Sequence, residues 1–201
     1  MAKSEILLKV GVTGGIGAGK SIVCGIFSTL GVPVYNADQH AKFLMENDPA
    51  IISQIRKNFS DESYANGRLN NRFLSAIVFN NKDNLAHLNQ IVHPRVRVDF
   101  GEWLELHKGR RYIIKEAALL FESKSFKELD KTILVVSPLE TRIRRVILRD
   151  QHRNRQEIEK IIENQMPDNE KTQLADFVIQ NDDSHMIIPQ VLKINEEILS
   201  Q

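Results

Sequence analysis

The spacing of hydrophobic residues changes along this chain, and the changes predict where strands and helices alternate. Residues 6–13 form a short, almost continuous apolar run rich in Ile, Leu and Val, which is typical of a strand buried on both faces. Further strands are predicted in the segments 32–38, 110–121, 131–137 and 175–182. Because helical stretches separate most of these runs, the strands are expected to pair in parallel.

Helices are predicted where apolar residues recur every three or four positions. The first runs from Gly19 to about Leu30, and Gly31 ends it. A later helix is expected to open at Ser137, because Pro138 at its first position and Glu140 complete the pattern of a capping box. Two further helices present one apolar face each, formed by Ile158, Ile161 and Ile162 in the first and by Ile187, Val191, Ile194 and Ile198 in the closing one.

Residues 37–110 differ from the rest of the chain, because their apolar residues keep helical spacing almost throughout. Only the polar stretch SDESYANGR, at residues 60–68, interrupts the pattern. The segment is therefore predicted to be a mostly helical insertion. The order of elements predicts an α/β fold, in which a parallel sheet is covered by helices on both faces and carries this insertion.

Composition narrows the class of protein. The 201 residues are 42% hydrophobic and 26% charged, with a net charge of +1, which indicates neither disorder nor a nucleic-acid coat. The single Cys24 and six scattered histidines predict neither a disulfide nor a His/Cys metal site. No apolar run reaches the roughly 20 residues of a membrane span, and Lys9 interrupts the first one. We therefore expect a cytoplasmic protein without a signal peptide.

A glycine-rich segment follows the first predicted strand and precedes the first predicted helix. It matches the phosphate-binding pattern G-x-x-x-x-G-K-[ST] at every fixed position. A chance match in a chain of this length has odds of about one in a hundred. We therefore expect ATP to bind here, with Lys20 at the β- and γ-phosphates and the Ser21 hydroxyl on Mg²⁺. The loop consists of Gly14, Gly15, Ile16, Gly17, Ala18, Gly19, Lys20 and Ser21.

Two acidic residues are expected at the edge of the sheet where ligands of such folds bind. Asp38 ends the second predicted strand, where a carboxylate could accept the proton of an attacking hydroxyl or simply cap the helix that follows. Position alone favours neither reading. Glu116 ends the strand YIIKE and could support Mg²⁺ or be an ordinary acid at the end of a strand.

An arginine-rich helix is predicted after Ser137. Arg142, Arg145 and Arg149 share one face. Residues 142–155 also include Arg144, Arg153 and Arg155. The segment therefore contains six arginines but only one acidic residue, Asp150. Charge runs are usually solvated, but this imbalance suggests a mobile lid that neutralises phosphate. Since no guanine-reading NKxD segment follows any strand, these features together favour a small-molecule kinase over a GTPase.

The same segments resemble the dephospho-coenzyme A kinase family. VGVTGGIGAGKS, GVPVYNAD, GRLNNRFLSAIVF, LNQIVHPRVR, ALLFE, VVSPLETRIRRVILRD, ENQ and ADFVIQND occur in the order found in that family. The resemblance implies a P-loop NTPase-type core of residues 1–36, 111–139 and 171–201, a substrate-binding domain of residues 37–110 and a lid of residues 140–170. It also implies transfer of the ATP γ-phosphate to the 3′-hydroxyl of dephospho-CoA.

The resemblance also implies site residues. Asp38 would be the general base, assisted by Lys20 and Arg145, while Ser21 and Glu116 would serve Mg²⁺. The nucleotide would further contact Ile22, Arg145, Arg149 and Asn181, and dephospho-CoA would contact Asp38, Arg72, His93 and Leu120. For His93 alone, a structural role beside Pro94 is the simpler reading. A monomer or weak homo-oligomer without nucleic-acid or membrane partners is expected.

Three departures from the family pattern concern this site. The usual DAD is Asn36-Ala37-Asp38, so one carboxylate is replaced by an amide. The usual Asp-x-Pro is Glu116-Ala117-Ala118, and Ile22 replaces the hydroxyl that often follows Ser21. The alternatives to the favoured function are another P-loop kinase, acting on a nucleoside, nucleotide or small acid, and a non-catalytic ATP-binding regulator.

Overall fold

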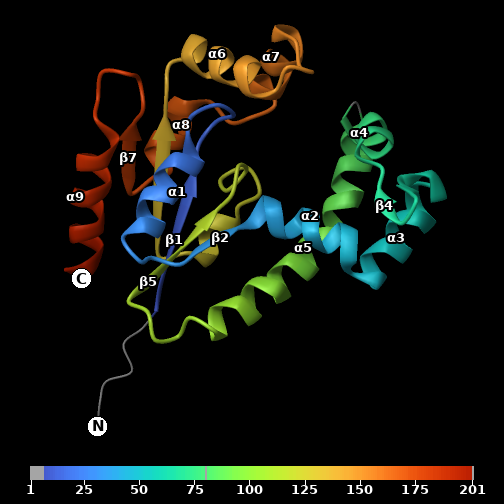
Figure 1. Ribbon diagram of the computed structural model, residues 1–201, viewed down its shortest axis with the longest axis horizontal. Helices are drawn as coiled ribbons and strands as arrows, with labels where there is room; N and C mark the ends of the chain where they lie inside the picture. The colour runs from blue at the N-terminus through green and yellow to red at the C-terminus, as the bar shows by residue number, and fades with distance from the viewer. Residues whose placement is uncertain (1–6, 80, 201) are drawn as a thin grey trace. The chain divides into compact units, whose positions relative to one another are not determined.

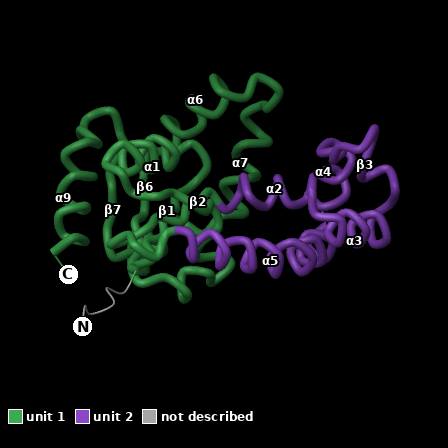
Figure 2. Tube along the Cα trace, turned by 60° about the horizontal axis from the view of Figure 1, so that its bottom comes forward, with its two compact units in different colours: residues 1–36, 107–201 green, residues 37–106 purple. Residues whose placement is uncertain are grey.

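A computed structural model describes residues 7–79 and 81–200. The chain divides into two compact units, which are considered separately below (Figure 2). The core unit comprises residues 1–36 and 107–201, and the helical unit comprises residues 37–106. The helical unit thus ends four residues before the predicted boundary at 110. The expected start of the first strand at Ile6 lies outside the described residues.

The core unit is organised around a parallel sheet, as predicted. Within the described part of the chain this sheet has five strands in the order β2-β5-β1-β6-β7, and every neighbouring pair is parallel. Asn36 pairs with Glu116, and Val12 pairs with the same residue from the other side. The carboxyl ends of the strands therefore meet at one edge. The strands are β1 (Leu8–Thr13), β2 (Val34–Asn36), β5 (Tyr112–Glu116), β6 (Lys131–Val136) and β7 (Phe177–Gln180).

Helices cover one face of the sheet, while the other face has a mixed cover. Apolar residues of α1 (Lys20–Thr29) and α9 (Ile187–Leu199) pack on alternate strand residues to form the main core. On the other face, Leu120 and Leu129 reach β1 so closely that a Cβ on Gly11 would lie 2.6 Å from either side chain. Leu129 directly follows η2 (Ser125–Glu128). Helix α8 (Asp168–Leu174) packs against β6.

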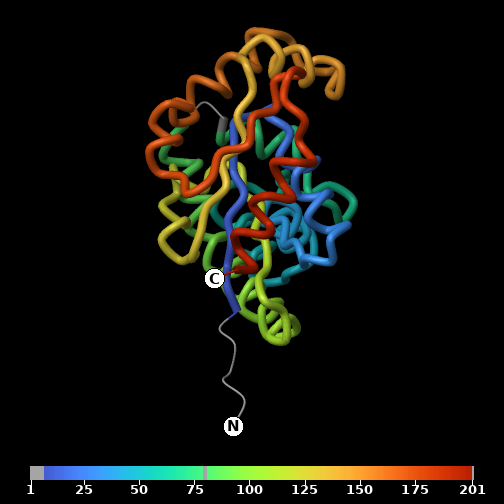
Figure 3. The backbone as a smooth tube through the Cα atoms, turned by 90° about the vertical axis from the view of Figure 1, so that its left-hand side faces the viewer, coloured from blue at the N-terminus to red at the C-terminus, as the bar shows by residue number. Residues whose placement is uncertain are grey.

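Helices α6 (Leu139–Arg149) and α7 (Arg155–Glu163) lie beyond the carboxyl edge of the sheet, at the opposite end of the core unit from the C-terminus of α9 (Figures 1 and 3). The capping box predicted at Ser137 is wrong: α6 starts one residue later than expected, Pro138 is the N-cap, and no side chain caps it. The Ser137 hydroxyl instead accepts a hydrogen bond from Arg145. A capping box does occur at Asn154 and Glu157, at the start of α7.

The helical unit confirms the prediction of a mostly helical insertion. It contains α2 (Ala37–Asn47), α3 (Pro49–Phe59), α4 (Asn71–Phe79) and the long α5 (Lys82–Glu105). The polar stretch of residues 60–68 contributes η1 (Asp61–Ser63) and a small hairpin, β3 (Tyr64–Ala65) with β4 (Arg68–Leu69). Across the described residues, no helix is long and apolar enough to cross a membrane.

Asp48 joins two helices of this unit. Its carboxylate accepts hydrogen bonds from the Ala50 and Ile51 amides at the start of α3, at 2.8 and 3.3 Å, and from Arg95 Nε of α5 at 2.7 Å. Burial by itself would raise the pKa of this carboxyl, but the hydrogen bonds from Arg95 and the helix amides outweigh it and lower the pKa. The ionised form is therefore the one that stabilises the fold.

We predict that Asp48→Ala lowers the free energy of unfolding at pH 7 by about 2 kcal/mol, because both a helix cap and a partly buried ion pair are lost. Since the folded pKa lies below the unfolded one, the wild-type advantage is complete above about pH 4 and declines as the pH falls further. Urea denaturation at pH 7 and pH 3 measures both effects. Asp48→Asn keeps a capping oxygen and should lose less than Asp48→Ala, whereas full wild-type stability of Asp48→Asn would show that the charge contributes nothing.

Candidate active site

The glycine-rich loop joins the end of β1 to the start of α1. Gly17 and Gly19 have φ values of 78° and 97°, which a residue with a Cβ adopts only with strain. The Lys20 ammonium folds back and donates a hydrogen bond to the Gly14 carbonyl at 2.9 Å. The loop therefore curls around the N-terminus of α1, where backbone amides and the helix dipole favour an anion.

Backbone and side chains from other segments press directly against this loop. A Cβ added to any of its glycines would meet another atom at 2.5 Å or less: Val135 O at Gly14, Arg142 Nη1 at Gly15, Arg142 O at Gly17 and Asn181 Nδ2 at Gly19. Glycine is thus required for packing as well as for phosphate binding. The Ala18 carbonyl also accepts a hydrogen bond from Asn181 Nδ2 at 2.7 Å.

A carboxylate lies beside the start of α1. Glu116 Oε1 accepts a hydrogen bond from Ser21 Oγ at 3.1 Å, and its Oε2 accepts one from Asn36 Nδ2 at 2.8 Å. The amide at position 36 thus donates to Glu116, where the carboxylate usual in the family would repel it. Hydroxyl and carboxylate oxygens are the ligands that Mg²⁺ prefers, so the pair Ser21 and Glu116 fits such an ion.

Cys24, a residue of α1, lies next to the Glu116 carboxylate. Burial, and then the negative charge of Glu116, raises the pKa of the Cys24 thiol well above its ordinary value. The thiol is therefore neutral, and Cys24 behaves as a small buried side chain of the core. Among the described residues, no group of three or more His, Cys, Asp or Glu side chains could hold a metal ion.

Arg142 is buried at the base of α6. Its side chain is 8% exposed, and its Nη1 lies 3.2 Å from Asp168 Oδ2 at the start of α8. The same helix contributes Ile143 and Val146 to a small core with Ile158 of α7, against which Ile16 of the glycine-rich loop packs. The first half of the predicted lid therefore packs against the loop through a hydrophobic cluster.

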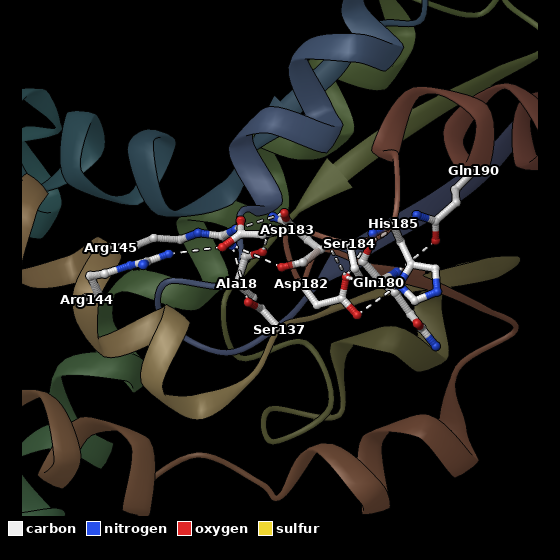
Figure 4. A network of polar contacts seen from close by, with 11 residues as sticks. Ala18, Ser137, Arg144, Arg145, Gln180, Asp182, Asp183, Ser184, His185 and Gln190 are labelled. Atoms are coloured by element: carbon white, nitrogen blue, oxygen red, sulfur yellow. Dashed lines mark hydrogen bonds and ion pairs between the residues drawn. The ribbon is translucent and has the colours of Figure 1, made fainter.

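Arg145 belongs to a polar network with the segment that follows β7 (Figure 4). Its guanidinium donates to Ser137 Oγ, to both oxygens of Asn181 and, at 2.8 Å, to Asp183 Oδ1. Asn181 in turn contacts the glycine-rich loop through Ala18. The structure thus brings together the predicted nucleotide contacts Arg145 and Asn181.

The loop after β7 is stiffened by its own side chains (Figure 4). Asp182 Oδ1 accepts hydrogen bonds from the Ser184 and His185 amides, both at 3.0 Å, and the His185 ring nitrogen lies 2.9 Å from the same carboxylate. The hydrogen bond from His185, followed by that from Ser184, lowers the pKa of the Asp182 carboxyl well below its ordinary value.

The apparent excess of arginine is largely compensated by acids from distant positions. Arg142 pairs with Asp168, and Arg144 and Arg145 pair with Asp183. Closer in sequence, Arg153 pairs with Asp150, and Arg155 pairs with Glu140 and Glu159. Arg149 differs: it is exposed at the end of α6, and its side chain makes no hydrogen bond or ion pair within residues 7–79 and 81–200.

A surface pocket of about 520 Å³ opens beside the loop after β7. Its apolar walls come from α1 and the start of α9, and Asn181, Asp183 and His185 line its polar part. Ile22, the residue directly after the P-loop serine, is one of the apolar residues. The others are Ile26, Met186, Ile187 and Ile188.

The predicted substrate residues fall in both units. Asp38, Arg72 and His93 belong to the helical unit and are exposed, on α2, α4 and α5 respectively. Asp38 lies in the first turn of α2, which begins at Ala37, so it neither ends a strand nor caps the helix. Leu120 belongs to the core unit and is fully buried against Gly11, so a direct contact with substrate would require this segment to move.

Gln165 is a residue of this site that the sequence reasoning did not identify. It follows α7, and its Oε1 accepts a hydrogen bond from the Ile16 amide at 3.0 Å, across 149 residues of sequence. The only sequence signal was its place in the segment ENQ. No periodicity connects it to the glycine-rich loop.

The fold and the loop together define a P-loop NTPase fold of the kind found in small-molecule kinases. The shikimate kinase of Acinetobacter baumannii shares the fold, with a TM-score of 0.52 at 14% identity over 98% of this chain and 95% of that one. TT1252 from Thermus thermophilus is more similar, with a TM-score of 0.84 at 32% identity over 96% and 97% of the two chains.

The chain belongs to the dephospho-CoA kinase family, whose model matches residues 8–186. A dephospho-CoA kinase of Bacteroides fragilis is 36% identical, over 93% of this chain and 91% of that protein. That of Fusobacterium nucleatum is 39% identical, over 87% and 90%. The solved dephospho-CoA kinase of Campylobacter jejuni has a TM-score of 0.69 at 27% identity, over 94% and 96% of the two chains.

The contact between Asn36 and Glu116 predicts how a second carboxylate would act. Asn36→Asp should lower the melting temperature of the metal-free protein by about 3 °C, because about 1 kcal/mol of like-charge repulsion replaces a hydrogen bond. Mg²⁺ alone should then restore the loss, as a thermal unfolding series with and without the ion would show. Asn36→Ala is the control, since it removes the hydrogen bond without adding charge. If Mg²⁺ stabilises Asn36→Asp no more than Asn36→Ala, a carboxylate at position 36 does not take part in a cation site beside Glu116.

Proposed function

We propose that this protein transfers the γ-phosphoryl group of ATP to the 3′-hydroxyl of the dephospho-CoA ribose, giving CoA and ADP. Two observations support the proposal together. The chain has a P-loop, with Lys20 and Ser21 at the start of α1, and the family match spans both units. The helical unit follows directly after β2, and Asp38 is its second residue. This insertion is large enough to bind a bulky substrate.

Two features of the core unit suggest where ATP would lie: the pocket beside Ile22 and the glycine-rich loop. The pocket beside Ile22 has apolar walls and a few polar groups, which suits a flat heterocyclic base. The phosphates would then follow the loop from Ser21 toward Gly14, where Lys20 already lies. Arg145 and Asn181, held together by hydrogen bonds, would support the nucleotide between base and phosphates.

Mg²⁺ would be held by the Ser21 hydroxyl, the carboxylate of Glu116 and the phosphates themselves. This donor set agrees with the preference of Mg²⁺ for one or two protein oxygens together with substrate phosphates. When bound, the ion would neutralise charge on the β- and γ-phosphates. Asn36, by donating to Glu116 Oε2, would orient the carboxylate so that Oε1 stays directed at Ser21.

Asp38 is the proposed general base. Its carboxylate would accept the proton of the 3′-hydroxyl as the hydroxyl oxygen bonds to the γ-phosphorus, while the bond from that phosphorus to the β–γ bridging oxygen breaks and ADP leaves. Asp38 lies in the first turn of α2, near the positive end of the helix.

Residues 140–170 are proposed to act as a lid that excludes water during transfer. Exposed Arg149, without an ion pair among the described residues, is available for the phosphates, whereas Arg145 would exchange Asp183 for them. In the helical unit, exposed Arg72 and His93 are proposed to contact dephospho-CoA. For Arg72 the natural target is a phosphate of that substrate.

The proposed reaction is tested with purified protein, ATP and Mg²⁺ in an assay that couples ADP release to a spectroscopic signal. ADP release should depend on added dephospho-CoA, and the product should be heavier by one phosphate. Stimulation by a nucleoside, nucleotide or small acid instead would favour another P-loop kinase. ATP binding without transfer to any acceptor would favour a regulator.

Asp38→Asn should reduce kcat at least about 100-fold, because the general base is lost. The dissociation constant for ATP, measured by calorimetry, should stay within a factor of two, since Asp38 is proposed to serve the acceptor. Asp61→Asn is a matched control in the same unit, because the Asp61 side chain is 90% exposed. Near-wild-type turnover of the Asp38 variant would remove this residue from the mechanism.

A further inference from the structure

The segment between α7 and α8 brings a side-chain amide to the glycine-rich loop. Gln165 Oε1 accepts the Ile16 N–H at 3.0 Å and lies 3.5 Å from the position that a Cβ on Gly15 would occupy. The amide therefore sits against the second and third residues of the P-loop. None of the roles assigned above to the loop, the arginines or the acids uses it.

This contact determines which way the amide points. A backbone N–H can be accepted only by the carboxamide oxygen, so the Nε2 group must face away from Ile16. Within the described residues, Nε2 of Gln165 makes no hydrogen bond, although the side chain is half-buried. Two N–H donors are thus held in one orientation beside the loop, without an acceptor in the described part of the chain.

The backbone on the next residue is anchored independently. The Met166 amide donates to Glu122 Oε1 at 2.9 Å, and the same oxygen lies 3.0 Å from the ammonium of Lys171, whose side chain is fully buried. Asp168, two residues after Met166, pairs with Arg142. Gln165 is therefore held both by its side chain and by its neighbours, as a preorganised hydrogen-bond donor must be.

The position of Gln165 along the loop indicates which phosphate it would meet. Lys20, which serves the β- and γ-phosphates in P-loops, contacts the Gly14 carbonyl. The pocket proposed for the base lies at the opposite end, at Ile22. Gln165 touches Gly15 and Ile16, so it lies at the end of the loop where the terminal phosphate is expected.

We propose that Gln165 is a catalytic residue, whose Nε2 donates a hydrogen bond to an oxygen of the γ-phosphoryl group as it is transferred. The inference rests on the proposed function. Gln165 neither gains nor loses a proton: the bridging oxygen leaves on ADP, the acceptor oxygen bonds to phosphorus, and the hydroxyl proton goes to Asp38. A neutral donor complements Lys20, because it stabilises charge on the moving group without binding the ground state strongly.

Two substitutions separate donation to phosphate from acceptance of the Ile16 amide. Gln165→Glu keeps an oxygen for the Ile16 N–H but loses the donor, and Gln165→Met loses both without adding charge. We expect kcat to fall by about 100-fold in both variants. Affinity for the transition-state analogue ADP–aluminium fluoride should fall by a similar factor, while affinity for ADP changes by less than threefold.

The matched control is Gln173→Glu, an exposed position on α8 that makes the same chemical change in the same part of the core unit. It should leave kcat and melting temperature unchanged. If Gln165→Glu keeps wild-type kcat and only Gln165→Met loses it, Gln165 merely supports the loop and the inference is overturned. An effect of Gln165→Glu confined to KM for ATP would likewise overturn it, as simple charge repulsion.

These outcomes are separate from a failure of the proposed function. An inactive wild-type protein with dephospho-CoA would reject the reaction itself, before any variant is compared. In that event the ADP and ADP–aluminium fluoride affinities still report whether Gln165 contacts the position of the terminal phosphate, and equal ratios in wild type and both variants would overturn the contact.

Discussion

The close approach of other segments to the glycine-rich loop is the constraint on which the rest of the core unit depends. At each loop glycine, an added Cβ would overlap an atom of β6, of α6 or of the segment after β7. The absence of side chains therefore does two things at once. It exposes backbone amides to phosphate, and it allows the elements that carry Arg142, Arg145 and Asn181 to rest on the same few residues.

This packing links the proposed lid to the glycine-rich loop. The Ile16 side chain packs in the small core between α6 and α7, and its amide donates to Gln165, so one loop residue contacts the proposed lid in two ways. Arg142 adds a third contact through Gly15. If residues 140–170 act as the proposed lid, these contacts would connect its closure to phosphate binding at the loop without a separate sensor.

Local patterns explain which features could be predicted from the sequence. The P-loop, the parallel strands and the helical insertion all follow from the spacing of residues within short windows, and the structure confirms them. Contacts between distant residues could not be predicted in this way: the counterions of Arg142 and Arg145 are Asp168 and Asp183, and the partner of Ile16 is 149 residues away. The capping box at Ser137 failed for the same reason, because the hydroxyl is engaged by Arg145.

We propose that the terminal phosphate of ATP lies at the Gly14–Gly15 end of the loop and that Asp38 accepts the proton of the ribose hydroxyl. A crystal structure with a non-hydrolysable ATP analogue, Mg²⁺ and dephospho-CoA tests this most directly. We expect the base in the pocket beside Ile22, the terminal phosphate in contact with Lys20 and Gln165, and the 3′-hydroxyl within hydrogen-bond distance of Asp38. A terminal phosphate at the Ile22 end, or a hydroxyl directed away from Asp38, would contradict it.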